Sequence, residues 1–336
     1  MYAILYRSLF ALLTAFGIAA LRGPVTIPML RQLKFGQNVR DDGPQSHLKK
    51  QGTPTMGGIM ILLAIIVSSL LWGGQSYSFL LIALLMSGLF GIVGFADDFI
   101  KIVRKRSLGL RAWQKIAAQF VLGTGFALWL YHAENVGPTL WLDRLNIGVF
   151  YVPFALFVII ATVNSVNLTD GLDGLSSSVT AIYSIAMSAL LCMAVLTAPQ
   201  ATPAQQLLDL SALSVFCSAV AGGCIGFLVH NVYPAKVFMG DAGAFTLGGA
   251  VAAMALLSRT ALLLPLMGIC FVASSVSVIL QVGSYKLRNK KRIFRMAPLH
   301  HHFELGGTPE TKIVSLYSIV TAMCSAAALL IYWFAK

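Results

Sequence analysis

Two adjacent carboxylates, Asp97 and Asp98, end a long apolar run that extends from Phe79 to Ala96. If this run is a helix that ends here, both carboxylates lie at the negative end of its dipole, which costs each about 0.3–1 kcal/mol before they repel each other. Lys101 follows at i+4 and i+3 and supplies one compensating charge. A divalent metal ion is the other obvious partner. Two solvated acids at a membrane edge are the alternative.

Three further aspartates lie in turn-forming segments between apolar runs. Asn167–Gly174 carries Asp170 and Asp173, and Asn231–Gly243 carries Asp241. Asp173 and Asp241 each stand where an apolar run begins, so helix N-capping is the alternative for both. The acids of the first segment are three apart and no later glutamate follows, which excludes a calcium-binding loop.

Cationic and imidazole side chains occupy the remaining polar segments. Lys50 lies in a loop rich in glycine and proline that reaches Thr55, where backbone amides and an ammonium group can hold phosphate. No Lys-Ser/Thr follows the glycines, so this is not a Walker loop, and a basic juxtamembrane loop with a helix start at Thr55 is the alternative. The successive histidines His300 to His302 point in different directions, which favours phosphate or carboxylate recognition, or proton transfer, over a zinc site.

The elements that position these groups are membrane helices. The chain has 336 residues, of which 57% are hydrophobic and 11% charged, with a mean hydropathy of +0.80. These values predict an all-α polytopic membrane protein that forms one domain over 1–336. About ten apolar runs approach the spanning length of ~20 residues: 3–21, 56–73, 78–96, 113–131, 148–166, 174–196, 209–229, 243–258, 261–283 and 313–334. The first run is interpreted as an uncleaved span rather than a secretory signal.

Positive charge is distributed unevenly between the two sets of alternate loops. One set, with its flanking residues, contains every Lys and Arg except Arg7, Arg144, Arg259 and Lys336. By the positive-inside rule this side is cytoplasmic and both termini face outward. The net charge of +12 is therefore a topology signal, and it predicts membrane lipids and an anionic substrate as partners, with no nucleic acid.

Small residues inside the spans are interpreted as packing residues. Gly88, Gly91 and Gly94 precede the Asp pair at three-residue spacing, which predicts close helix packing. The cysteines all fall inside predicted spans, without metal-ligand or redox spacing, and are read as small buried hydrophobes: Cys192, Cys217, Cys224, Cys270 and Cys324.

The predicted topology brings the polar segments to one membrane face. Five separate loops supply Asp97 and Asp98, Asp170 and Asp173, Asp241, Lys50, and the three histidines. Carboxylates, lysines and histidines at a membrane edge suit Mg²⁺-assisted phosphoryl chemistry on a substrate that is half lipid and half soluble. Hard oxygen ligands without a positioned thiolate favour Mg²⁺ or Mn²⁺ over zinc.

Five segments resemble the motifs of the polyprenyl-phosphate N-acetylhexosamine-1-phosphate transferases: Lys50–Gly58, Gly94–Lys101, Asn167–Leu175, Asn231–Gly243 and Arg292–Glu304. The resemblance runs from about Gly23 to Glu304. The Met296–Glu304 stretch resembles the branch that uses UDP-N-acetylmuramoyl-pentapeptide. It implies ten transmembrane helices in the bacterial inner membrane, a cytoplasmic active site and a homodimer. The implied reaction moves phospho-N-acetylmuramoyl-pentapeptide from its UDP carrier to undecaprenyl phosphate, giving lipid I and UMP.

The resemblance also implies roles for residues that match the motifs. Asp241 resembles the principal Mg²⁺ ligand, with Asp97 and Asp98 as the acidic pair and further candidate ligands. These three and His300 are the implied catalytic residues. Asp98 resembles a group that deprotonates or orients the polyprenyl phosphate, while direct and covalent two-step routes both stay open. The implied substrate contacts are Lys50, Thr55, Lys101, Asn167, Asp170, Asp173, Asn231, Phe238, Gln281 and His301, with Phe238 offering its ring to uracil.

Three other functions compete with this one: a sister enzyme, a secondary transporter, and a non-catalytic lipid-binding scaffold, which would need no cluster of oxygen ligands. A sister enzyme would use another UDP-N-acetylhexosamine as donor. A secondary transporter would place ionisable groups or broken helices near the middle of the membrane, whereas this sequence places its acids at one predicted face.

Overall fold

The computed structural model describes residues 3–32, 50, 52–74, 76–104, 108–133, 136–140 and 145–335. Within these ranges the chain is almost entirely helical. The helices are α1 (Ala3–Gln32), α3 (Gly58–Trp72), α4 (Ser78–Val103), α5 (Ala112–His132), η1 (Gly148–Phe150), α6 (Tyr151–Thr169), α7 (Leu175–Leu196), α8 (Ala204–Asn231), α9 (Gly240–Leu257), η2 (Ala261–Leu263), α10 (Leu264–Met267), α11 (Ile269–Leu287), α12 (Leu299–Glu304) and α13 (Glu310–Ala335). Two short strands, β1 (Thr139–Leu140) and β2 (Leu145–Asn146), pair antiparallel. The all-α prediction is confirmed.

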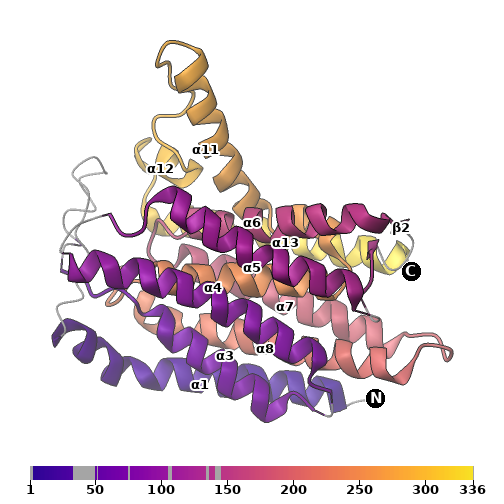
Figure 1. The fold of residues 1–336 in the computed structure, drawn as a ribbon. Coiled ribbons are helices and arrows are strands. Elements are labelled where there is room, and N and C mark those ends of the chain that lie inside the picture. The colour runs from indigo at the N-terminus through magenta and orange to yellow at the C-terminus, as the bar shows by residue number, and fades with distance from the viewer. Residues whose placement is uncertain are drawn as a thin grey trace.

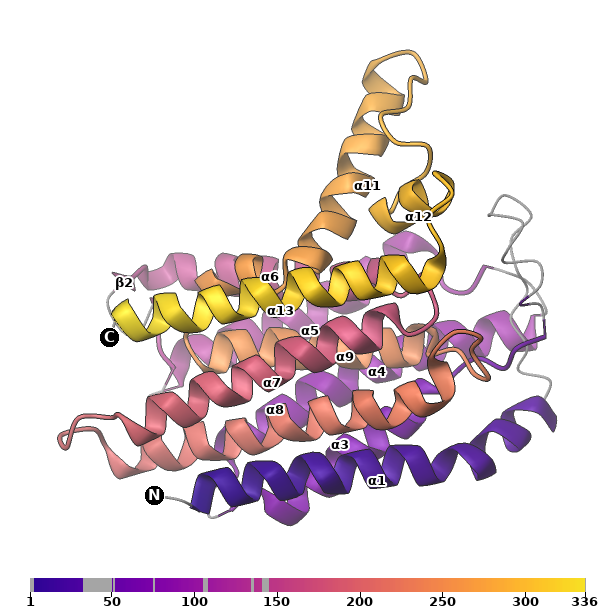
Figure 2. The same ribbon diagram turned by 180° about the vertical axis from the view of Figure 1, so that it is seen from behind.

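Apart from α11, the long helices lie side by side in one bundle (Figure 1), with α9 near its centre (Figure 2). Helix α9 packs against α3, α4 and α6, and 89% of its residues are buried. Neighbouring α8 is almost as enclosed, because α1, α3 and α7 cover it. The first turn of α9 therefore emerges from the middle of the bundle, where several helix ends can surround it.

Eight helices of the described ranges are long and apolar enough to cross a membrane: α1, α4, α6 with η1, α7, α8, α9, α11 and α13. Helix α3 is apolar but has 15 residues, which gives about 22 Å against a hydrocarbon core of about 30 Å. Helix α5, with 21 residues, is not among the eight. Each of the ten predicted runs contains a helix, but in the described ranges eight helices are long and apolar enough to cross a membrane. The polytopic architecture is confirmed.

Two predicted spans differ from the observed helices. Helix α1 runs to Gln32 instead of ending near residue 21, with Pro24 and Pro28 inside it. The run 261–283 is not one span. It breaks at Gly268, whose φ of −98° and ψ of 27° end α10, and α11 then leaves the bundle at a steep angle (Figures 1 and 2).

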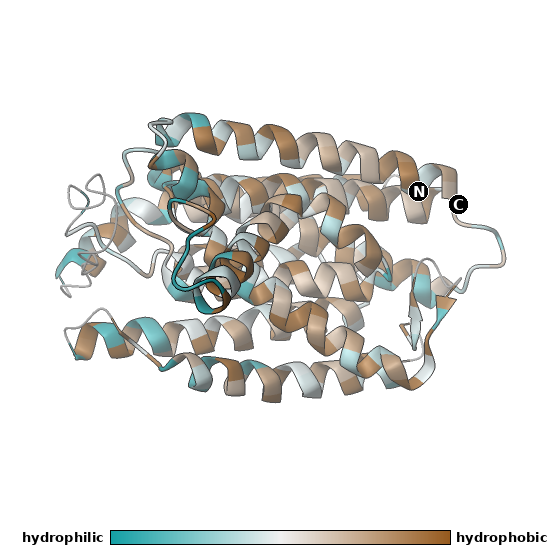
Figure 3. Ribbon diagram, turned by 90° about the horizontal axis from the view of Figure 1, so that it is seen from above, coloured by the Kyte–Doolittle hydropathy of each residue, from teal (hydrophilic) through white to brown (hydrophobic). Residues whose placement is uncertain are grey.

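The bundle has one polar end. Hydrophilic residues gather at the end where α4 and α8 finish, away from both chain termini (Figure 3). Both termini lie at the opposite end (Figure 1). Which end faces the cytoplasm stays a prediction from charge.

Helices α4 and α9 approach each other closely because α4 presents glycines. A Cβ on Gly91 would overlap the hydroxyl of Thr246, and one on Gly94 would overlap the carbonyl of Asp241. Close packing is confirmed for these two glycines. The packing prediction is wrong for Gly88, which has open space beside it. Each three-residue step along a helix falls about 60° short of a full turn, so Gly88 points away from α9 when Gly94 faces it.

We expect Gly94→Ala to destabilise the protein by about 1–3 kcal/mol, because the added methyl group forces α4 away from α9. The melting temperature in detergent measures this effect. Gly88→Ala is the matched control on the same helix, and it should melt at or slightly above the wild-type temperature. Equal melting temperatures for the two variants would contradict the packing argument.

Candidate active site

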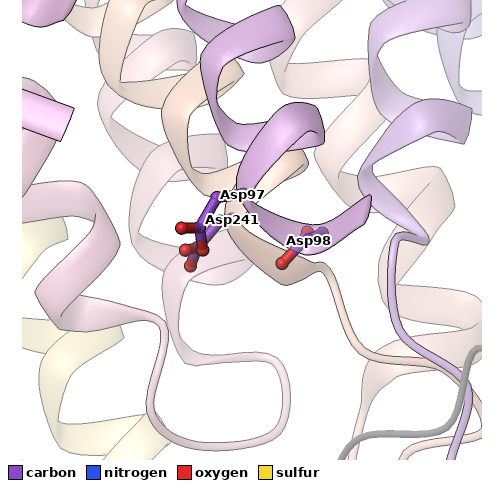
Figure 4. Close-up of side chains that lie close together, drawn as sticks. All are labelled: Asp97, Asp98 and Asp241. Carbon is purple, nitrogen blue, oxygen red and sulfur yellow. The ribbon is translucent and has the colours of Figure 1, made fainter. Parts of the chain in front are cut away.

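Three carboxylates from two helices lie together at the polar end of the bundle (Figure 4). Asp97 and Asp98 belong to α4, and Asp241 lies in the first turn of α9. One oxygen atom from each carboxylate lies within 4.8 Å of the other two. Asp97 and Asp98 are buried, with exposed fractions of 0% and 3%.

Helix α4 does not end at the Asp pair, as the sequence suggested, but continues to Val103. Local ion pairs favour this continuation. The Nζ atom of Lys101 lies 2.6 Å from Oδ2 of Asp97 and 3.2 Å from Oδ1 of Asp98. The i+3 and i+4 pairing that the spacing predicts is therefore present.

The acids of α4 also organise the beginning of α9. The backbone amide of Ala242 donates a hydrogen bond of 3.0 Å to Oδ2 of Asp98. This amide lies in the first turn, where helix donors have no intrahelical acceptor. Met239 occupies the N-cap position of α9, so the N-capping alternative for Asp241 is wrong. Asp98 of another helix satisfies the first turn instead.

Lys115 of α5 also belongs to this cluster, although it is not among the predicted site residues. Its Nζ atom lies 2.9 Å from Oδ2 of Asp97 and 2.7 Å from Oδ2 of Asp241. Lys101 also reaches Oδ2 of Asp241, at 2.9 Å. The two ammonium groups thus bridge carboxylates of α4 and α9. The available signal was a lysine in the first turn of an apolar run on the basic side.

Asn167 and Thr55, two predicted substrate contacts, lie at the same cluster. The amide of Asn167, at the end of α6, donates to Oδ1 of Asp241 at 2.9 Å. Thr55 lies beside Gly240, because a Cβ on that glycine would lie 2.9 Å from Oγ1 of Thr55 and 2.5 Å from the carboxylate of Asp98. The ends of three other helices, α4, α5 and α6, and one loop therefore surround Asp241 at the beginning of α9.

A second charged cluster joins the neighbouring loops. The Nζ atom of Lys50 lies 2.7 Å from Oδ1 of Asp173 and 2.7 Å from Oε1 of Glu310. Burial opposes the charge of Lys50, but hydrogen bonds to Asp173 and Glu310 keep its pKa above the ordinary value. The other oxygen of Asp173 accepts from the amide of Ala235 at 2.9 Å. Gly174 is the N-cap of α7, so Asp173 ties loops together instead of capping that helix.

Glu310, in the first turn of α13, was also missed by sequence reasoning. Its carboxylate accepts hydrogen bonds from Nζ of Lys50 and from the backbone amide of Asp173. In the sequence, the only indication of such a role was the position of Glu310 at the basic end of the last apolar run.

The remaining predicted residues hold the surrounding loops. Asn231 donates to the carbonyl of Val237 and accepts from the amide of Gly174. The backbone amide of Phe238 donates to the carbonyl of Pro54 at 2.8 Å.

The predicted residues near the C-terminus lie on α11 and α12. Gln281, on α11, binds the backbone of Ile293 and Phe294 through both side-chain polar atoms. His300 is fully buried on α12 and packs against Gly171, while Nδ1 of His301 lies 3.0 Å from Glu304. The histidine segment therefore adjoins the loop that carries Asp170.

Asp170 directly follows α6, and its carboxylate is repelled by acids of both clusters. Burial, followed by repulsion from Asp241, Asp98 and Asp173, raises the pKa of Asp170 to about 8. A raised pKa favours the protonated form in the folded protein. This contribution to stability is complete below the ordinary pKa near 4 and is lost as the pH rises through about 8.

We therefore expect Asp170→Asn to stabilise the metal-free protein increasingly as the pH rises, because the amide never becomes charged. The melting temperature of the variant, measured with a chelator, should exceed that of the wild type by more at pH ~8.5 than at pH ~5. If the difference in melting temperature stays constant or narrows over this pH range, the pKa of Asp170 is not raised.

The oxygen atoms of Asp97, Asp98 and Asp241, the acid cluster, suit a hard divalent cation. Three carboxylates and two ammonium groups leave one negative charge, and carboxylate oxygens are the ligands that Mg²⁺ and Mn²⁺ prefer. Asp97, Asp98 and Asp241 are therefore the residues that could hold the metal. The arrangement can bring anionic phosphate groups beside a metal and two lysines.

Two family models match the chain. Glycosyl transferase family 4 matches residues 80–259. A phospho-N-acetylmuramoyl-pentapeptide-transferase signature matches residues 50–62.

Curated relatives that carry the name phospho-N-acetylmuramoyl-pentapeptide-transferase are similar over nearly the whole chain. The relative from Caldanaerobacter subterraneus subsp. tengcongensis is 46% identical over 323 residues, which cover 95% of this chain and 96% of the relative. The relative from Heliobacterium modesticaldum is 43% identical, covering 92% of each protein. The relative from Thermodesulfovibrio yellowstonii is 42% identical, covering 97% of this chain and 93% of its own.

Proposed function

Because this chain belongs to the phospho-N-acetylmuramoyl-pentapeptide transferase family, we propose how its polar end performs that transfer. The protein is a membrane transferase of peptidoglycan synthesis. In our proposal it takes phospho-N-acetylmuramoyl-pentapeptide from a UDP carrier, transfers it to undecaprenyl phosphate at the cytoplasmic face of the bacterial inner membrane, and releases UMP. The convergence of Asp97, Asp98 and Asp241 with two lysines supports the site assignment.

The three carboxylates are the proposed Mg²⁺ ligands, with Mn²⁺ as a substitute. When bound, the ion supplies positive charge that neutralises the diphosphate of the donor. Lys101 and Lys115 add two positive charges where phosphate groups of donor and acceptor must approach each other. Holding these anions together accelerates the transfer through positioning and charge neutralisation. Asp98 is the proposed group that orients, or takes a proton from, the lipid phosphate.

The second cluster is the proposed nucleoside side of the donor site. Lys50 and Asp173 meet there, and Phe238 lies in the loop whose backbone joins Pro54 and Gly57. The half-buried ring of Phe238 can stack on a flat base. His300 and His301 lie beyond Gly171 and are assigned to the sugar and peptide part.

UMP release by the purified protein in detergent tests this function. Release from UDP-N-acetylmuramoyl-pentapeptide should require undecaprenyl phosphate and should stop when a chelator removes divalent ions. UDP-N-acetylglucosamine is the control donor for the sister activity, and we expect no release from it. A folded protein that releases no UMP from the pentapeptide donor would refute the proposal. The homodimer that the resemblance implies stays a prediction.

A further inference from the structure

We propose that Gln119 and Asn164 are positioning residues for the transfer reaction. They form an amide pair between α5 and α6 that sets the register of the two helices, so that Lys115 and Asn167 both reach Asp241. This inference rests on the function proposed above, since it assigns the pair to the same site.

The pair forms side-chain hydrogen bonds between α5 and α6 below the site. Gln119 is fully buried. The amide nitrogen of Asn164 donates to Oε1 of Gln119 at 2.6 Å and to the carbonyl of Ile160 at 2.7 Å. The amide nitrogen of Gln119 reaches Oδ1 of Asn164 at 3.4 Å. A buried amide that loses its partner is costly, so this alignment is strongly preferred.

The amide pair lies one helical turn below the two contacts to Asp241. Lys115 precedes Gln119 by four residues, and Asn167 follows Asn164 by three. Residues at these spacings share a helix face, about 6 Å apart along the axis for four residues and about 4.5 Å for three. Helix α5 begins at the polar end and α6 finishes there (Figure 1), so both steps lead from the amide pair toward the acid cluster.

The two helices hold opposite oxygens of the same carboxylate. Lys115 of α5 contacts Oδ2 of Asp241 at 2.7 Å, and Asn167 of α6 donates to Oδ1 at 2.9 Å. A displacement of α5 along α6 would therefore lengthen one contact while the other stays in place. A reciprocal amide pair has a single alignment, so it opposes such sliding and specifies the register of the two helices.

A double variant, Gln119→Leu with Asn164→Leu, tests the role of the pair. Replacing both partners with apolar groups of similar size leaves no unpaired amide, so the melting temperature should stay close to that of the wild type. We expect kcat for UMP release to fall about tenfold or more, because small displacements of catalytic groups are costly. The KM for the UDP donor should change far less than kcat, since the second cluster is untouched.

The exchange variant, Gln119→Asn with Asn164→Gln, restores an amide pair of the same total length. It should recover most of the lost kcat. Ser188→Ala is the matched control, because it removes the buried hydrogen bond of 2.8 Å between Ser188 of α7 and Ser218 of α8. It should lower the melting temperature without lowering kcat per folded protein.

Wild-type kcat in the Leu/Leu variant would overturn the inference. An exchange variant as slow as the Leu/Leu variant would also overturn it, because the amide pair itself would then not be responsible. If kcat per folded protein is unchanged while the folded fraction drops, the pair is merely structural. Absence of UMP release from the wild-type protein would instead refute the proposed function, so the two failures are distinguishable.

Discussion

Asp241→Ala should lower kcat for UMP release by about 10³-fold, the scale expected when a preorganised charge is removed from a reacting centre. Asp241 is the carboxylate on which the site converges. Its Oδ1 accepts from Asn167, and its Oδ2 contacts Lys101 and Lys115. Removing it deprives the proposed metal of one ligand and leaves Asp97 as the carboxylate that both lysines still contact. The rate of UMP release at saturating substrates measures the loss.

Asp241→Asn separates charge from shape, because the amide has nearly the same size and still offers one acceptor oxygen. We expect it to be almost as slow as the alanine variant. Asp209→Asn is the control, since Asp209 is also buried but bonds Ser76 and Gln205 near the start of α8, at the opposite end of the bundle. It should alter stability and spare kcat. An Asp241→Asn enzyme with near wild-type kcat would contradict a metal role for Asp241.

Lys115→Met should lower kcat by about 10²-fold, which is the second largest effect we expect. Its ammonium group bridges Asp97 and Asp241 across two helices. Methionine keeps most of the apolar stem but leaves Lys101 alone to balance three carboxylates. The added repulsion misplaces the carboxylates, and a positive charge is lost where phosphate groups approach.

Lys312→Met provides the comparison for this variant. Lys312 is exposed in the first turns of α13, on the same polar end but outside both clusters, and its loss should leave kcat within about twofold. Comparable rates for the two lysine variants would show that general positive charge, not the bridge, supports the reaction.

Contacts within one helix could be predicted from the sequence. Asp97, Asp98 and Lys101 meet because helical spacing brings i+3 and i+4 neighbours together, whatever the rest of the fold does. The loop topology also placed Asp241 and Asn167 on the same side as this group. Loop alternation assigns a side of the membrane, so it correctly collected the residues that form the acid cluster.

Lateral neighbours could not be predicted in this way. Loop alternation does not say which helix ends touch, so Lys115 and Glu310 remained unnoticed at the margins of their runs. The break at Gly268 was invisible for another reason. Hydropathy stays high across 261–283, and membrane spans tolerate glycine and proline, so only the backbone angles of Gly268 reveal that the helix stops.

The pairing of α4 with α9 also has a consequence for the order in which the protein is made. Lys101 and Asp241 are 140 positions apart, so a ribosome completes α5, α6, α7 and α8 before α9 exists. During that interval, the two acids of α4 lack the amide of Ala242 that later binds Asp98. Acids are costly in a membrane helix unless they find partners. Lys101, made four residues after Asp97, supplies such a partner from the moment that α4 forms, and Lys115 follows with the next helix. The two acids of α4 are therefore neutralised stepwise during synthesis, and the site is complete only when α9 brings Asp241 to the centre of the bundle.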